Sequence, residues 1–215
     1  MSLRITEIFA SIQGESSHAG RPCSFVRLTG CNLSCKWCDT AYARQGGLET
    51  PLYEILPKVK ALGIGLVEVT GGEPLLQAET PQLVKALLDE GFEVLVETNG
   101  SFYISRLDRR AKVILDVKCP SSGEAGSILR ENLETLTSRD EVKFVIAQNQ
   151  DFDYAASVLK DHPGVLSNCR AVHFSPVFGV CDPALLARWI LDARLPVRLG
   201  LQLHKYVWDP EKRGV

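Results

Sequence analysis

The sequence predicts an α/β protein built as a partial, open (β/α) barrel of about six parallel strands. Short apolar runs rich in β-branched residues alternate along the chain with segments of helical periodicity. This alternation indicates a parallel sheet with right-handed crossover connections. The chain has 215 residues, fewer than the roughly 250 of a typical complete eight-stranded barrel. We therefore expect a barrel that stays open on one side, where a substrate can enter.

The individual elements follow from the position of the apolar runs and of the residues that begin helices. The expected strands are residues 24–29, 66–70, 93–98, 113–117, 142–147, 171–174 and 197–203. The expected helices are residues 52–62, 81–90, 151–160 and 183–193. Thr80 and Asp182 each precede a proline, and that arrangement predicts helix N-caps at both positions.

Composition bounds the class of protein. No repeat, low-complexity tract or linker divides the chain, so residues 1–215 are expected to form a single domain. The formal net charge of -2 gives no basic footprint for nucleic acid. The N-terminal segment does not resemble a signal peptide, and no apolar run is long enough to span a membrane. We expect a cytoplasmic protein without a nucleic-acid or membrane partner.

Seven cysteines in such a chain favour ligand or core roles over disulfides, because the cytosol keeps thiols reduced. Cys31, Cys35 and Cys38 form a C-x3-C-x2-C spacing on a loop directly after an expected strand. A [4Fe-4S] cluster normally takes four cysteines, so three would leave one iron open to a small molecule. The other four, Cys23, Cys119, Cys169 and Cys181, are scattered and are expected to be small buried side chains.

Two other metal sites compete with this interpretation. A zinc loop would need a fourth cysteine or histidine at a suitable spacing, and none is near. An electron-transfer ferredoxin would have a C-x2-C-x2-C run with a fourth cysteine, which is absent.

The cysteine spacing, with the aromatic Trp37 before the last cysteine, resembles the motif of the radical S-adenosylmethionine (SAM) superfamily. The Thr70-Gly71-Gly72-Glu73-Pro74 turn resembles that superfamily's site for the SAM amino group. The resemblance implies that the open iron binds SAM and that reductive cleavage of SAM gives a 5'-deoxyadenosyl radical. It assigns SAM contacts to Trp37, Cys38, Asp39, Gly72, Glu73, Asp116, Val117 and Lys118.

Within the superfamily, the chain is most similar to the 7-carboxy-7-deazaguanine synthase family, from its N-terminus to His204-Lys205. Five segments carry this similarity: Ile12-Gln13-Gly14-Glu15 with Arg27, Cys38-Asp39-Thr40, Glu97-Thr98-Asn99-Gly100, Asp116-Val117-Lys118 and Gln202-Leu203-His204-Lys205. The implied substrate contacts are Ile12, Gln13, Gly14, Glu15, Arg27, Thr70 and His204. The implied Mg²⁺ ligand is Thr40.

The family resemblance implies a lyase that converts 6-carboxy-5,6,7,8-tetrahydropterin to 7-carboxy-7-deazaguanine with loss of ammonia, a step toward queuosine. SAM would be used catalytically, with Mg²⁺ assisting. The implied partners are a pterin substrate, a low-potential electron donor such as flavodoxin, and a second copy of the chain in a homodimer. Where some members end near a proline, this chain continues from Pro210 to Val215.

The residue types suit these roles. The planar fork of Arg27 fits a carboxylate, and the amide of Gln13 and the carboxylate of Glu15 fit polar edges of a pterin. The hydroxyl of Thr40 fits Mg²⁺. Structural alternatives exist: Arg27 pairing with a surface carboxylate, Thr40 capping a turn, and Glu97 accepting from backbone groups. Lys118 and Lys143 either approach SAM or extend to solvent.

Two rival functions remain open at this point. One is an activase that uses the same cluster and SAM to place a glycyl radical on a partner protein, and it would need no pterin pocket. The combination of Gln13, Glu15, Arg27 and Thr40 favours a small polar ring instead. The other is a non-catalytic metal-binding module, which tight SAM binding would argue against.

Overall fold

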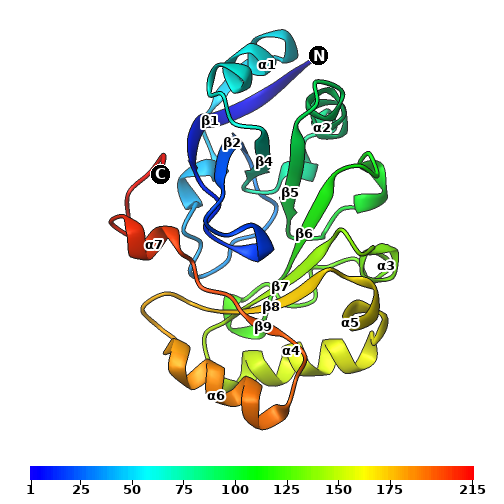
Figure 1. Ribbon diagram of the computed structural model, residues 1–215, viewed down its shortest axis with the longest axis vertical. Helices are drawn as coiled ribbons and strands as arrows, with labels where there is room; N and C mark the ends of the chain where they lie inside the picture. Colours follow the sequence, from blue (N-terminus) through cyan, green and yellow to red (C-terminus); the bar gives the residue numbers. More distant parts are fainter.

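The computed structural model describes residues 1–215, and its strands form one curved sheet (Figure 1). The strands are β1 (Ser2–Ile12), β2 (Pro22–Leu28), β3 (Leu48–Pro51), β4 (Leu66–Gly71), β5 (Glu93–Thr98), β6 (Lys112–Val117), β7 (Glu141–Ile146), β8 (Ala171–Pro176) and β9 (Arg198–Leu199). Their spatial order is β3-β1-β2-β4-β5-β6-β7-β8-β9. β3 and β9 are the two free edges, so the barrel is open, as predicted.

The parallel part of the sheet runs from β2 to β9, and β1 and β3 extend it in antiparallel fashion. Parallel strands need crossover connections, and helices supply several of them. The helices are α1 (Leu52–Ala61), α2 (Thr80–Asp89), α3 (Arg130–Thr135), α4 (Asn149–Asp161), α5 (Gly164–Asn168), α6 (Pro183–Ala193) and α7 (His204–Val207). Figure 1 shows α4 and α6 along the outside of the sheet near β7 to β9. None of these helices combines the length and apolar character needed to cross a membrane.

The two faces of the sheet have different chemistry, because successive side chains of a strand point to opposite faces. On β4, Val67 and Val69 belong to the large core under the helices, whereas Glu68 and Thr70 lie on the concave face. The concave face has only a small apolar cluster, formed by Cys23, Phe25, Leu66, Leu95 and Ile114. Polar side chains occupy much of the rest of this face, and they line the cavity described below.

The structure confirms most expected elements and corrects three. Residues 197–203 contain only the two-residue strand β9 at the sheet edge, where pairing comes from β8 alone. Thr80 is the first residue of α2 and not its cap, and its hydroxyl donates to the Pro74 carbonyl. β1 was not expected, although its buried Leu3 and Ile5 show the alternation of a strand. Asp182 caps α6 as predicted, accepting from the Ala184 N–H.

Candidate active site

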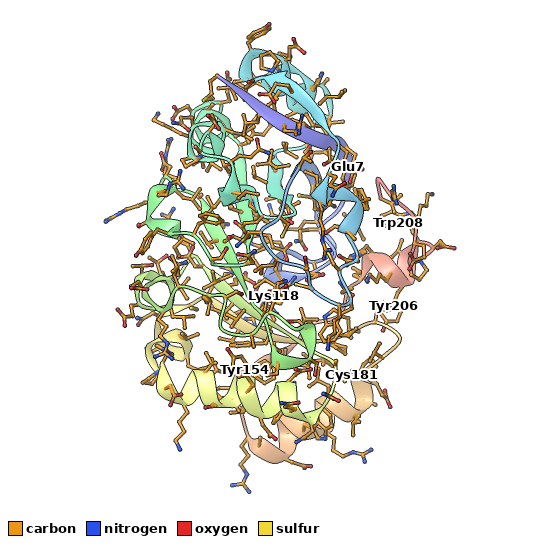
Figure 2. All side chains as sticks on the ribbon, turned by 180° about the vertical axis from the view of Figure 1, so that it is seen from behind. Glu7, Lys118, Tyr154, Cys181, Tyr206 and Trp208 are labelled. Atoms are coloured by element: carbon orange, nitrogen blue, oxygen red, sulfur yellow. The ribbon has the colours of Figure 1, made fainter.

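A cavity of about 650 Å³ opens on the concave side of the sheet. Its walls come from the carboxyl ends of β2, β4, β5, β6 and β7, the cysteine loop and the C-terminal segment. This is the face on which barrel enzymes place their chemistry. In Figure 2, Lys118 lies near the centre of the molecule, and Tyr206 and Trp208 mark the C-terminal segment at the rim.

The three motif cysteines all line this cavity. Cys31, Cys35 and Cys38 are free and half-buried on the loop after β2. Backbone contacts fix the loop: the Lys36 N–H donates to the Ser122 carbonyl, and the Ser34 N–H donates to the Glu124 carboxylate. Burial raises the pKa of the Cys31 and Cys35 thiols. No group of three His, Cys, Asp or Glu side chains is arranged around a single metal ion, whereas three thiols opening into one wide cavity suit a larger cluster.

The Gly71-Gly72 turn brings the end of β4 against the cysteine loop. A Cβ atom on Gly72 would lie 2.2 Å from the Gly30 oxygen and 2.7 Å from the Cys31 Cβ, so only glycine permits this contact. The next residue, Glu73, is fully buried and does not line the cavity. Its carboxylate accepts from the Leu75 N–H, the Thr98 hydroxyl and the Asn99 N–H. Glu73 therefore has the structural role, acceptor for backbone groups, that the sequence offers as an alternative for Glu97.

Arg27 stands at one corner of the cavity with only part of its guanidinium engaged. Its Nε donates to Glu7 Oε1 at 2.7 Å, and the Tyr42 hydroxyl donates to the same oxygen. The guanidinium carbon lies 5.9 Å from the Phe9 ring centroid and 6.0 Å from that of Tyr42. The terminal amino groups of Arg27 make no hydrogen bond within the chain and remain available to an anion.

A network of buried charges forms the opposite wall. The Lys143 ammonium donates to Glu15 Oε2 at 2.6 Å and to Glu97 Oε1, and it lies 3.5 Å from Asp116 Oδ2. Burial alone would lower the pKa of Lys143, but these carboxylates hold it well above the usual range. Lys118 pairs with Asp116 at 2.7 Å, which leaves Asp116 Oδ1 buried without a partner. Lys118 and Lys143 thus face the cavity and do not extend to solvent.

The Gln13 amide is already engaged at both ends. Its Nε2 donates to Glu68 Oε2 at 2.7 Å, and its Oε1 accepts from the Glu15 N–H. Glu15 is likewise paired, with Lys143 and with Gln202 Nε2. These side chains therefore shape the loop after β1, and the loop presents residues 12–15 to the cavity.

The C-terminal segment closes the open side of the barrel. The Leu203 N–H donates to the Gly14 carbonyl, and the His204 ring packs so closely that a Cβ on Gly14 would lie 2.0 Å from His204 Nδ1. Burial lowers the pKa of His204. Lys205 Nζ lies 3.2 Å from Asp39 Oδ2, which ties the segment to the cysteine loop. Both figures show this segment beside β1 and β2.

The tail after the segment also lines the cavity, from Pro210 to Val215. The Arg213 guanidinium lies 4.1 Å from the centroid of the Tyr42 ring, within the range of a cation–π contact. A second guanidinium therefore stands at the corner that holds Arg27.

Comparisons with known proteins agree with this geometry. A family model described as "Radical SAM superfamily" matches residues 25–122, which include the cysteine loop and the Gly71-Gly72 turn. The 7-carboxy-7-deazaguanine synthase of Koribacter versatilis is 45% identical over 99% of this chain and 100% of its own. That of Chlorobaculum tepidum is 48% identical over 99% of this chain and 97% of its own.

The chain belongs to the 7-carboxy-7-deazaguanine synthase family. It is a radical SAM enzyme of the lyase type, and its cofactors are a [4Fe-4S] cluster and SAM. The crystal structure of QueE from Escherichia coli superposes on this chain with a TM-score of 0.77. The superposition covers 95% of each chain, and the sequences are 23% identical. That likeness concerns the fold, and it supports the partial open barrel.

The residues of this family member fit its cofactors. Three free thiols open into the cavity from one loop, and the buried Asp116 Oδ1 is an acceptor that a bound molecule can satisfy. The cavity brings together these predicted residues: Ile12, Gln13, Gly14, Glu15, Arg27, Cys31, Cys35, Trp37, Cys38, Asp39, Thr40, Thr70, Gly72, Asp116, Lys118 and His204. It does not include Glu73 or Val117, whose side chain packs in the core on the other face.

Sequence reasoning missed some residues of the cavity in this synthase family member. Glu68, Tyr42 and Arg213 line it without having been singled out. One signal was available for Glu68: it is a lone charge inside the apolar run of β4. No local pattern points to Tyr42 or Arg213, because their contact joins segments distant in the sequence.

Proposed function

We propose that the enzyme converts 6-carboxy-5,6,7,8-tetrahydropterin to 7-carboxy-7-deazaguanine and ammonia, a step toward queuosine and other 7-deazapurines. The full-length similarity to synthases of that name carries the proposal. A cavity that joins three thiols to a partly free guanidinium supports it. When bound, the cluster and SAM supply a 5'-deoxyadenosyl radical that removes hydrogen from the substrate.

On the cofactor side, Cys31, Cys35 and Cys38 would ligate the cluster as thiolates. Gly72 lets the turn after β4 pack directly against Cys31, and the cavity-lining backbone of this turn suits the amino group of SAM. Asp116 Oδ1 is an acceptor suited to a hydroxyl of the SAM ribose, and Lys118 keeps Asp116 ionised. Burial raises the pKa of Asp116, but the adjacent Lys118 and Lys143 overcome this and lower it.

On the substrate side, Arg27 would bind the pterin carboxylate with its free amino groups. The backbone of residues 12–14 would meet the edge of the ring, since the Gln13 side chain is engaged elsewhere. Thr70 and His204 line the cavity as further hydrogen-bonding groups. Held in this way, the substrate is oriented and partly removed from water.

Thr40 is our proposed protein ligand for Mg²⁺. Thr40 lines the cavity, and its hydroxyl makes no capping hydrogen bond to the turn Ala41–Arg44; its one hydrogen-bond partner is the Cys38 thiol at 3.8 Å. Mg²⁺ usually keeps several waters, and one hydroxyl with a substrate carboxylate is sufficient to place it. Activity should rise with added Mg²⁺, and Thr40→Ala should weaken this response more than Thr40→Ser. Equal Mg²⁺ responses of both variants and the wild type would exclude Thr40.

The wider partners are also proposals. We infer a homodimer and a low-potential electron donor such as flavodoxin from membership of the family. Sedimentation velocity on the reconstituted enzyme tests the first, and turnover with reduced flavodoxin in place of a chemical reductant tests the second.

The deciding experiment is anaerobic turnover of the reconstituted enzyme with SAM, reductant, Mg²⁺ and 6-carboxytetrahydropterin, followed by mass spectrometry. Formation of 7-carboxy-7-deazaguanine is the expected result. Release of 5'-deoxyadenosine from SAM with intact pterin would refute the assignment of the pterin as substrate and would favour an activase of a partner protein. An intact cluster with neither reaction would favour a binding module.

A cysteine variant tests the cluster ligands separately. Cys35→Ala should lose most bound iron and sulfide, because a ligand is removed. Cys169→Ala is the matched control, since Cys169 is a half-buried thiol that does not line the cavity. Equal iron contents in the two variants would contradict the assignment of Cys35.

A further inference from the structure

Glu68 is a buried carboxyl group at the floor of the cavity for which the proposed function has no use so far. Glu68 is 2% exposed and lines the cavity from the middle of β4. Phe25 of β2 and Leu95 of β5 are its neighbours in register on the two adjacent strands. An apolar surrounding of this kind strongly disfavours an isolated charge.

The polar partners of Glu68 include a second carboxyl group. Gln13 donates to Glu68 Oε2 at 2.7 Å, and the Glu97 carboxyl lies within hydrogen-bonding reach on β5. The other titratable groups that face Glu68 are Glu15 from the loop after β1 and the Cys23 thiol from β2. No cation contacts Glu68, because Lys143 is bound to Glu15 and Glu97.

Charge balance in the cavity wall leads to the same conclusion. Two ammonium groups, Lys118 and Lys143, face three carboxylates, Glu15, Glu97 and Asp116. An ionised Glu68 would add a fourth negative charge next to one already present. Two carboxyl groups in contact cannot both ionise readily. Burial, followed by the nearby Glu97, raises the pKa of Glu68 to about 8.

We propose that Glu68 and Glu97 hold one proton between them at the floor of the cavity, and that Glu68 is the proton reserve for the loss of ammonia. Glu97, whose side chain is 23% exposed, faces the substrate. Glu68 lies deeper, and its proton reaches the substrate only by way of Glu97, so Glu68 is a positioning residue that stores the proton. The inference rests on the proposed function and extends it to a step after hydrogen abstraction.

The chemistry balances without an added oxidant or reductant. Loss of ammonia requires that carbon gives up one proton and that the leaving nitrogen gains one. The electron pair of the C–H bond becomes the new double bond, and the pair of the C–N bond leaves with nitrogen. The single proton of the pair passes from Glu68 to Glu97 and from Glu97 to the leaving nitrogen, which leaves both carboxylates ionised, and the proton released from carbon then refills the pair.

Infrared spectroscopy of the reconstituted enzyme tests the shared proton without turnover. The wild type should show the carbonyl band of a protonated carboxyl group at pH 7, and the band should disappear with a midpoint near pH 8. Glu68→Gln should lack this band. A wild type without the band, or a variant that retains it, would overturn the shared proton.

Turnover then tests the proposed role. Glu68→Gln preserves an acceptor for Gln13 but cannot release a proton, so product formation should fall by about 100-fold or more, as for loss of a general acid. The wild-type rate should decline above about pH 8, and this decline should be absent in the variant. Transfer of substrate deuterium into SAM should continue, because it precedes ammonia loss.

Glu93→Gln is the matched control, because Glu93 starts the same strand as Glu97 and lies outside the cavity. It should retain product formation. A Glu68→Gln enzyme with wild-type rate and pH profile would refute the proton reserve. A wild type that makes no product would refute the proposed function instead, and the infrared result would still decide on the carboxyl pair.

Discussion

At the scale of single residues, Arg27 shows how one side chain serves structure and recognition together. Its Nε–H donates a hydrogen bond to Glu7, and the Phe9 and Tyr42 rings flank the guanidinium, which is therefore held in place before substrate arrives. The alternative that Arg27 pairs only with a surface carboxylate is thus half correct. Glu7 is a structural partner, yet it leaves the terminal amino groups free for an anion.

We expect Arg27→Ala to weaken pterin binding by on the order of 2 kcal/mol, because a buried carboxylate would lose its charged partner. Arg27→Lys should recover only part of this, since it restores the charge without the planar fork. Anaerobic calorimetry with the substrate measures the effect, and SAM affinity serves as the control. Unchanged pterin affinity in Arg27→Ala would place the substrate carboxylate elsewhere.

Glu68 gives a prediction for stability as well as for catalysis. Its pKa rises from 4.5 to about 8 on folding, so between these values the folded chain holds a proton that the unfolded chain has lost. Stability from this group therefore falls as pH rises, by about 1.4 kcal/mol per pH unit at most. Glu68→Gln removes this slope.

Anaerobic urea unfolding at pH 6 and pH 8 measures this difference. From pH 6 to pH 8 the free energy of unfolding of the wild type should fall by roughly 2 kcal/mol more than that of Glu68→Gln. A pH-independent difference between the two proteins would mean that Glu68 is already ionised at pH 6.

At the scale of elements, the cavity is made by segments that meet only in the folded chain. The loop after β2 carries the cysteines, the turn after β4 packs against it through Gly72, and the segment around α7 covers the open side. The tail from Pro210 to Val215 continues this cover, and Arg213 on the Tyr42 ring is its visible attachment.

Arg213→Ala should therefore loosen the tail and raise the KM for the pterin about two- to five-fold, the value of a cation–π contact of roughly 0.5–1 kcal/mol. Arg188→Ala is the matched control, because Arg188 is exposed on α6 away from the cavity. Steady-state kinetics on both variants makes the comparison. An equal KM in both would show that the tail does not contribute to substrate binding.

At the scale of the whole molecule, one sheet separates stability from chemistry. The convex face packs its valines, leucines and phenylalanines under the helices, while the concave face holds the charges and the cavity. Because every strand belongs to this sheet, we expect residues 1–215 to unfold in a single transition.

Phe144→Ala tests this expectation, since Phe144 of β7 is fully buried and packs against Phe174 of β8. The substitution should lower the free energy of unfolding by about 3–5 kcal/mol. Tyr53→Ala, at a residue 74% exposed on α1, should cost less than about 0.5 kcal/mol. Circular dichroism and tryptophan fluorescence should report the same midpoint for each protein, and separate midpoints would indicate independently unfolding parts.

Local patterns in the sequence were sufficient for the strands, for most helices and for the cysteine loop. An apolar run, a proline after a cap, or three cysteines within eight residues is determined by neighbours in the chain. The same patterns predicted a strand longer than β9 and did not predict β1, because the extent of a strand depends on the partner it pairs with.

The roles of individual polar residues were decided only by the tertiary structure. Lys143 meets Glu15 across 128 positions of sequence, and Glu68 meets Gln13 across 55. The Glu73 carboxylate accepts a hydrogen bond from the Asn99 N–H, whereas Glu97 lines the cavity. Charge, burial and proton affinity depend on such distant neighbours. The sequence by itself therefore determined the family, the cluster motif and the open barrel, and the fold decided which carboxyl groups are structural and which can hold a proton.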